Sequence, residues 1–142
     1  MTSRMIAALL VVLAAAPAFA ADAGNLQMFR KVEKQVLQYP HFTIFDSINA
    51  DVENGVVKLT GKVTMPYKRS DIERRIGKID GVTKIDNQIT VLPASLFDDD
   101  LRFRIARAIY SNPSFQMYGF RVNPPIHVIV EHGRVKIGRA HV

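Results

Sequence analysis

The chain has 142 residues, a formal net charge of +6 at pH 7 and no cysteine. This length fits one ordinary domain or two small ones, and the lack of cysteine excludes disulfides as a source of stability. The modest positive charge favours anionic partners such as lipid head groups, acidic glycans or nucleic acid. Beyond the N-terminal segment, no apolar run is long enough to cross a bilayer.

Residues 1–20 have the pattern of a secretory signal peptide. Arg4 precedes an apolar run from Met5 to Ala16, and Ala18-Phe19-Ala20 places small residues before a cleavage point. The run is short for a membrane span, although an uncleaved anchor is the alternative. We expect cleavage after Ala20, with Ala23 as the second choice, and a periplasmic location. Export leads us to expect no nucleic-acid partner.

The next segment predicts a helix followed by a hairpin. Met28, Val32, Val36 and Tyr39 share one helical stripe, which ends at Pro40. From Ile48 to Leu59, apolar and polar residues alternate on both sides of Asn54-Gly55, a strong hairpin signal.

A second helix and a third strand follow the hairpin. Ile72, Ile76 and Ile79 form an apolar stripe, and Gly81 marks the end of that helix. The stretch "VTKIDNQITVLP" then supplies a strand with Ile85 and Ile89 pointing inward. Three strands covered by two amphipathic helices can bury one core.

The C-terminal part repeats the beginning of this pattern. "IHVIVEHGRVKI", residues 126–137, matches "INADVENGVVKL", residues 48–59, at six of twelve positions. A helix containing Leu101, Ile105 and Ile109 precedes it, and the connection between them is longer than in the first copy. Because no second covering helix follows, we expect this part to pack poorly unless it docks on the first.

The element order and the segments "VENGVVKLTG" and "GVTKIDNQITV" resemble the BON domain of osmotically induced periplasmic proteins and nodulation-related proteins. The resemblance covers residues 26–93 and, for 98–137, a helix and hairpin only. It implies a cell-envelope module, often in tandem copies, that attaches to phospholipid membranes, and it supplies no catalytic motif. The predicted turn and packing positions are Asn54, Gly55, Gly61, Gly81 and Gly133.

We therefore predict an α+β fold: a small αββαβ module with both helices on one face of a three-stranded sheet at 26–93. A linker at 94–97 and a truncated second BON copy at 98–136 follow it. The last residues, Ile-Gly-Arg-Ala-His-Val, are what a widely used sequencing adapter encodes when it is read in frame. We interpret 137–142 as a non-native tail, and a naturally short protein is the alternative.

A basic surface is the candidate site for binding lipid phosphates. Arg74, Arg75 and Lys78 fall within an arc of about 100° on the second helix, away from its apolar stripe. An ordinary solvated face is the alternative for these cations, and folding onto the second core is the alternative for the aromatic cluster around Phe115 and Phe120. The full predicted lipid-binding set is Lys58, Lys62, Lys68, Arg74, Arg75, Lys78, Phe115 and Phe120.

No catalytic, metal-binding or cofactor-binding pattern accompanies this surface. The four histidines lack the spacing of metal ligands, and there is no nucleophile elbow or phosphate loop. We predict an exported, non-enzymatic protein that attaches to anionic phospholipid surfaces and helps to maintain the envelope under osmotic stress. The alternative is a periplasmic module that binds envelope proteins or cell-wall polymers.

Overall fold

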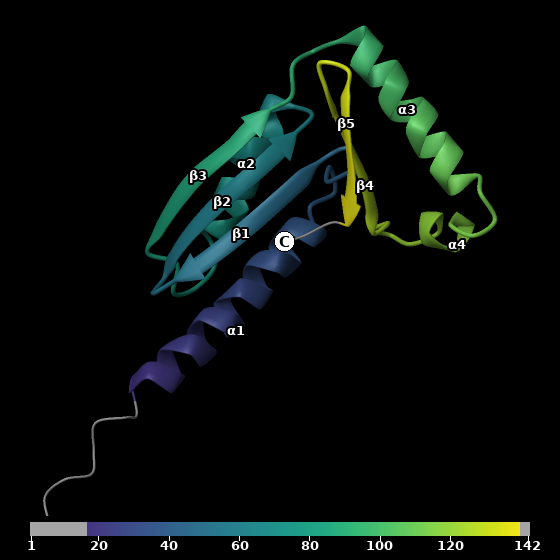
Figure 1. The fold of residues 1–142 in the computed structure, drawn as a ribbon. Helices are drawn as coiled ribbons and strands as arrows, with labels where there is room; N and C mark the ends of the chain where they lie inside the picture. The colour runs from purple at the N-terminus through teal and green to yellow at the C-terminus, as the bar shows by residue number, and fades with distance from the viewer. Residues whose placement is uncertain (1–16, 140–142) are drawn as a thin grey trace, which may run out of the picture.

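The computed structural model describes residues 17–139, with side chains from Ala23 onward, and confirms the predicted α+β fold (Figure 1). Residues 1–16, which hold most of the expected signal peptide, lie outside the described part, as do residues 140–142 of the expected tail. The elements are α1 (Pro17–Leu37), β1 (Ser47–Glu53), β2 (Val56–Val63), α2 (Pro66–Ile76), β3 (Lys84–Val91), α3 (Leu96–Tyr110), α4 (Gln116–Gly119), β4 (Ile126–Glu131) and β5 (Arg134–Arg139).

The first unit, residues 17–93, is a three-stranded sheet covered by two helices. The strand order is β1-β2-β3, with β1 antiparallel to β2 and β3 parallel to β2 through the crossover helix α2. Both helices pack on the same sheet face, so one core forms between them and the strands. Its fully or nearly fully buried members are Val32, Val36, Tyr39, Ile48, Val57, Leu59, Val63, Ile72, Ile76, Ile79 and Ile89.

Gly61 lets β1 and β2 approach each other closely at one end of the sheet. Its φ is +123°, and a Cβ atom there would lie 2.1 Å from the carbonyl oxygen of Ser47. A side chain at this position would therefore push the start of β1 away from β2.

The second unit, residues 94–139, is a helix and a hairpin joined by a loop that contains one turn of helix. α3 begins at Leu96, inside the segment expected to be the linker, because Ser95 caps it: the Ser95 Oγ accepts a hydrogen bond from Asp98 N at 3.2 Å. In Figure 1 the hairpin β4–β5 lies between the first sheet and α3. No helix within residues 17–139 has the length and apolar character needed to span a membrane.

The two hairpins turn in the same way. Asn54 and His132 both have φ of +50°, and the glycines that follow, Gly55 and Gly133, have φ of +82° and +72°. These left-handed conformations suit a two-residue turn between antiparallel strands.

Each turn is also held by a side chain from the helix that precedes it. The Asn25 Oδ1 accepts a hydrogen bond from Asn54 N at 3.0 Å, and the Asp98 carboxylate accepts from His132 N and Gly133 N at 2.8 Å each. Asn25 and Asp98 both stand fifteen residues before the proline that follows their helix, Pro40 or Pro113. The internal repeat is therefore a repeat of tertiary contacts as well as of sequence.

We expect Asp98→Ala to lower the free energy of unfolding by about 1–3 kcal/mol, because it removes the buried carboxylate that accepts hydrogen bonds from two turn amides. Urea unfolding measures the loss, and hydrogen exchange at the amides of His132 and Gly133 locates it. Asp100→Ala is the control: this side chain is 65% exposed and pairs only with Arg104, so its cost should stay within about 0.5 kcal/mol. Equal losses in the two variants would contradict the role of Asp98.

The second hairpin docks on the segment that leads into β1. Val128 N donates to Ile44 O at 2.8 Å, and the buried His127 ring hydrogen-bonds through Nδ1 to Asp46 O. Because a carbonyl oxygen can only accept, Nδ1 is the protonated nitrogen. Ile129, at the position of the exposed Asp51 in the first hairpin, is only 8% exposed. The second hairpin thus buries an apolar side chain at a position where the first hairpin exposes an acid.

The Asp46 side chain itself is a buried anion at the centre of this docking segment. Its carboxylate accepts hydrogen bonds from the backbone N and the hydroxyl of Thr43, from the backbone N and the hydroxyl of Thr64, and from the Lys68 ammonium, at 2.6–3.0 Å. Asp46 is fully buried and Lys68 is 4% exposed. A buried charge needs such complete pairing, so this cluster fixes the start of β1 to the start of α2.

Asp46→Asn should lower the free energy of unfolding by about 3–5 kcal/mol, since it leaves the Lys68 ammonium buried without a counter-charge. Chemical denaturation provides the measurement, and Asp51→Asn on the exposed face of β1 is the matched control. Replacing both partners, as in Asp46→Asn with Lys68→Met, should recover part of the loss. An Asp46→Asn variant as stable as the control would disprove this role for the ion pair.

Candidate functional site

Only some of the cations on the predicted basic face of α2 are exposed and unpaired. Lys68 lies inside the protein, paired with Asp46, so the structure removes it from the surface set. The Arg75 Nε donates to the backbone oxygen of Gln35 at 3.3 Å, and its guanidinium lies 5.7 Å from the centre of the Tyr39 ring. Arg75 therefore holds α2 to α1.

Two further residues, Arg74 and Lys78, set the charge that α2 and its C-terminal end present to solvent. Arg74 is exposed but forms an ion pair with Asp71 at 3.1 Å, and Asp71 also accepts a hydrogen bond from the Tyr39 hydroxyl at 2.8 Å. Burial, and then the bond to Asp71, raise the pKa of Tyr39 far above its usual value. Lys78 is exposed beyond the end of α2. The surface contribution of this helix is consequently less positive than its sequence indicates.

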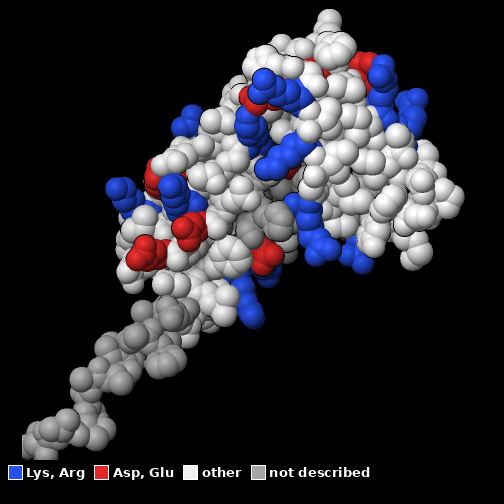
Figure 2. Space-filling view, viewed as in Figure 1, with Lys and Arg blue, Asp and Glu red and all other residues white. Residues whose placement is uncertain are grey.

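The uncovered face of the first sheet carries both signs of charge. Lys58 stands beside Asp51 of β1 and Asp86 of β3 in the strand register. Lys62 forms an ion pair with Glu131 of the second hairpin. Figure 2 shows lysines and arginines mixed with acidic residues over this unit. The two predicted lipid-binding cations of β2 thus lie beside acids.

The Lys62–Glu131 pair links the two units and makes the stability of their contact depend on pH. The hydrogen bond from Lys62 holds the pKa of Glu131 below its ordinary value of 4.5. Because that pKa is lower in the folded chain than in the unfolded one, the pair stabilises the fold above about pH 4.5. This contribution is lost as the pH falls through the lowered pKa.

Glu131→Gln should lower the free energy of unfolding at pH 7 by at most about 1 kcal/mol, because both side chains are more than one-third exposed. It should also reduce the loss of stability between pH 4.5 and more acidic solution. Unfolding curves recorded across this range measure both effects. Glu53→Gln, at the same position of the first hairpin, is the control, and an unchanged pH dependence in Glu131→Gln would disprove the linkage.

A second surface lies on the loop between α3 and β4. Met117, Phe120 and Val122 are 79%, 82% and 97% exposed, which is unusual for three large apolar side chains so close in sequence. Arg121 lies among them, with its guanidinium 5.7 Å from the centre of the Tyr118 ring. We call residues 115–122 the apolar loop.

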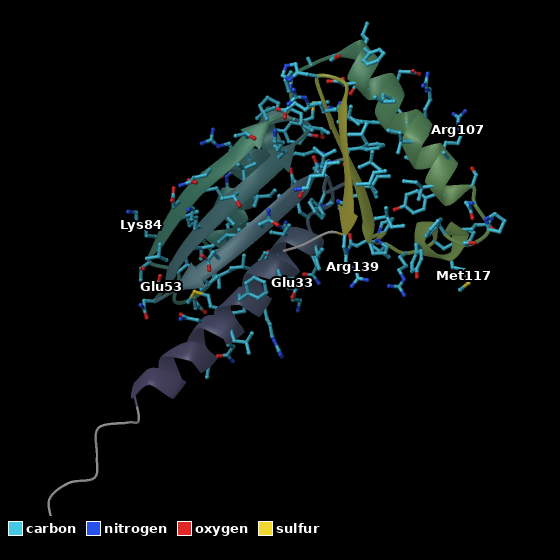
Figure 3. All side chains as sticks on the ribbon, in the orientation of Figure 1. Glu33, Glu53, Lys84, Arg107, Met117 and Arg139 are labelled. Atoms are coloured by element: carbon cyan, nitrogen blue, oxygen red, sulfur yellow. The ribbon has the colours of Figure 1, made fainter. Side chains whose placement is uncertain are left out.

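The apolar loop borders a hollow of about 780 Å³ between the helices of the second unit and its hairpin. Phe115 and Tyr118 line this hollow from the loop, and Arg121 stands at its margin with Arg139 of β5. In Figure 3, Met117 is labelled on the outside of α4 and Arg139 at the same end of the second unit. Figure 2 shows a largely uncharged surface over this unit, with lysines and arginines at its edges.

The structure places the two predicted aromatic residues differently. Phe120 is open to solvent, whereas Phe115 is 41% exposed and faces the hollow. Arg121, a cation within the loop, was not among the predicted site residues, although its place between Phe120 and Val122 is a readable signal. The pairing of Asp46 with Lys68 was not predicted either, because the sequence contains no periodic signal for it.

The three described histidines occupy different settings, and His141 lies outside the described residues. His41 is exposed and contacts the Tyr39 and Tyr67 rings edge-on, His127 is buried under Phe42, and His132 lies in the turn of the second hairpin. Within residues 17–139, no three side chains of the metal-binding types come together. The chemistry that the described surfaces offer is therefore charge pairing, hydrogen bonding and apolar contact.

The fold and these surfaces define a small α+β module in which a three-stranded sheet is covered on one face by two helices. Residues 29–93 match the model of the BON domain family, so this chain contains a BON domain that occupies its first unit. The family is generally non-catalytic.

Comparison with solved structures gives a similarity to CdsD, a structural protein of the Type III secretion system of Chlamydia trachomatis. The two chains are 22% identical with a TM-score of 0.44, and the match covers 56% of this chain and 37% of that one. A comparison with curated proteins found no match.

Proposed function

We propose that this protein is a non-enzymatic module of the cell envelope that attaches to the surface of anionic phospholipid membranes. The observation that carries the proposal is the apolar loop, with Met117, Phe120 and Val122 exposed around the cationic Arg121. The BON domain at residues 29–93 supports a role without catalysis. A periplasmic location and a role in envelope stress belong to the same proposal.

The physical basis is the joint action of apolar insertion and charge. Moving a large apolar side chain from water into the boundary of the acyl chains is favourable by about 25 cal/mol for each Å² of apolar surface that is buried. An arginine at the surface of an anionic membrane adds about 1 kcal/mol. Arg121 sits in sequence between two of the inserting side chains, so its guanidinium would reach the phosphate level as they enter. Such attachment is reversible and weakens with salt.

The apolar loop of the second unit suits membrane attachment better than the predicted basic face of α2 does. Lys68 is buried in an ion pair, the half-buried Arg75 contacts α1, and Arg74 is paired, so Lys78 is the free cation that α2 and its C-terminal end contribute among the predicted residues. The apolar loop, in contrast, presents its side chains without any competing ion pair to Arg121 among the described residues.

Vesicle co-sedimentation tests the proposal. The full chain should bind vesicles of anionic phospholipid more tightly than neutral ones, and the difference should shrink as salt is added. Arg121→Gln should weaken binding to anionic vesicles about five-fold, equivalent to about 1 kcal/mol, without changing binding to neutral vesicles. Phe120→Ser should weaken binding to both kinds of vesicle.

Matched controls come from α3. Arg104→Gln removes an arginine that pairs with Asp100, and Leu96→Ser removes an apolar side chain that is 90% exposed at the far end of the helix. Neither should change vesicle binding. Equal affinity for neutral and anionic vesicles, or equal effects of Arg121→Gln and Arg104→Gln, would overturn the proposed function.

A protein-interaction or wall-polymer module is the second candidate, and a specific observation favours the protein partner. All six residues of β5 are exposed, and β5 forms one edge of the two-stranded sheet. Exposed strand edges accept strands from other polypeptides.

A further inference from the structure

A groove of about 250 Å³ lies where the second hairpin meets the first sheet. Its polar and charged lining comes from both units: Ser47, Asn49 and Lys62 from the first sheet, and Glu131, Arg134 and Lys136 from the hairpin. Figure 2 shows lysines and arginines gathered over this junction. The groove is therefore a feature of the two units together.

The strand register explains why two cations of β5 face the first unit. Cross-strand partners share one face of a sheet, and here Arg134 is paired with Glu131 and Lys136 with Ile129. Ile129 is only 8% exposed, and Glu131 reaches across to Lys62 of the first sheet. Because this face of the hairpin turns toward the first sheet, Arg134 and Lys136 project over the groove.

The second hairpin differs from the first at the positions that give the groove its charge. Lys58 of the first hairpin has Asp51 as its cross-strand partner, whereas the equivalent Lys136 has Ile129. Arg134 stands where the first hairpin has a valine. Compared with the first copy, the second thus lacks an acid and has an additional cation on this face.

Two cations of the groove are unpaired. Glu131 forms its ion pair with Lys62, and no ion pair within the described part of the chain reaches Arg134 or Lys136. Three cations and one carboxylate line the groove, so it carries two net positive charges. An anion that binds here gains from both unpaired cations.

The charge and the size of the groove set the kind of ligand that it can hold. A phosphate monoester carries about −1.5 to −2 charges at pH 7, which matches the groove, whereas a carboxylate carries a single charge. The Arg134 guanidinium suits two phosphate oxygens at once. Sites for drug-sized ligands occupy about 300–1,000 Å³, so a groove of about 250 Å³ suits a smaller molecule.

Ser47 and Asn49 indicate the rest of the ligand. Their side chains make no hydrogen bond with another described residue. A hydroxyl and an amide both donate and accept hydrogen bonds, so they suit the hydroxyl groups of a sugar or a polyol. Ile129 also lines the groove and offers apolar contact to the C–H groups of such a molecule.

We propose that the groove between the first sheet and the second hairpin binds a small polyhydroxylated phosphate monoester, such as a sugar phosphate. Its phosphate lies between Arg134 and Lys136, and its hydroxyl groups bond to Ser47 and Asn49. Glu131 repels the phosphate and holds Lys62 away from it. The site is separate from the apolar loop and does not rest on attachment to a membrane.

An NMR titration of the isotopically labelled full chain with glucose 6-phosphate tests the proposal. We expect saturable shifts of the backbone amides of Ser47, Asn49, Arg134 and Lys136, with a Kd of about 0.1–1 mM for a ligand of this size. Glucose and glucuronate should bind at least about ten-fold more weakly, because each lacks the doubly charged phosphate.

Substitutions in the groove should change the affinity in opposite directions. Arg134→Gln and Lys136→Gln should each weaken binding of glucose 6-phosphate at least about five-fold. Glu131→Gln removes the repelling carboxylate and releases Lys62, so it should tighten binding about three-fold. Damage to the fold would not produce that gain. Lys58→Gln, which removes an exposed lysine of β2 outside the groove, is the control and should leave the affinity unchanged.

Four outcomes would overturn the proposal. The first is the absence of saturable shifts at the groove amides, and the second is weaker binding by Glu131→Gln. The third is an equal loss in Arg134→Gln and Lys58→Gln, which would reduce the effect to net charge. The fourth is displacement of glucose 6-phosphate by anionic vesicles, which would assign the groove to lipid phosphates. Arg134→Gln should leave vesicle binding through the apolar loop unchanged, so this proposal and the proposed function fail separately.

Discussion

The buried carboxylate of Asp46 is the constraint on which the rest of this structure depends. It takes hydrogen bonds from Thr43, Thr64 and Lys68, and so joins the end of the α1–β1 connection to the start of α2. The backbone oxygen of the same residue receives the ring of His127 from the second hairpin. A buried charge is costly unless it is fully paired, so the segment around Asp46 has little conformational freedom. The second hairpin is fixed in place because it binds to this segment.

The two units share the way in which a helix is tied to a hairpin turn, and they differ where they meet. In both units a side chain from the helix accepts hydrogen bonds from the hairpin turn, which ties the helix to the strands independently of the core. The copies differ where they meet, since Ile129 replaces the exposed Asp51 and becomes buried. At this position a polar residue of the first unit is therefore replaced by an apolar one in the second, where it is buried.

Ion pairs and hydrogen bonds make the exposed charge of the folded chain differ from the basic face that the sequence predicts. Lysines and arginines that read as one basic face on α2 are divided among a buried ion pair, a helix-to-helix contact and a surface pair. The apolar loop combines exposed apolar side chains with Arg121, which has no ion pair within the described residues, and β5 is fully exposed. Binding is accordingly proposed for the second unit, while the first contains the BON domain against which its hairpin is held.

The sequence by itself determined the longer helices, the strands and their order, but not α4 or the start of α3 within the expected linker. Strand alternation, helical stripes and the Asn54-Gly55 and His132-Gly133 turns are local patterns, and the structure has them where they were expected. Only the tertiary structure decided which cations are free, because Lys68 is buried against a partner twenty-two residues away and the half-buried Arg75 is bound to one forty residues away. Periodicity shows which side of a helix a residue occupies. It cannot show which distant atom will meet that residue, because that depends on how the elements pack together.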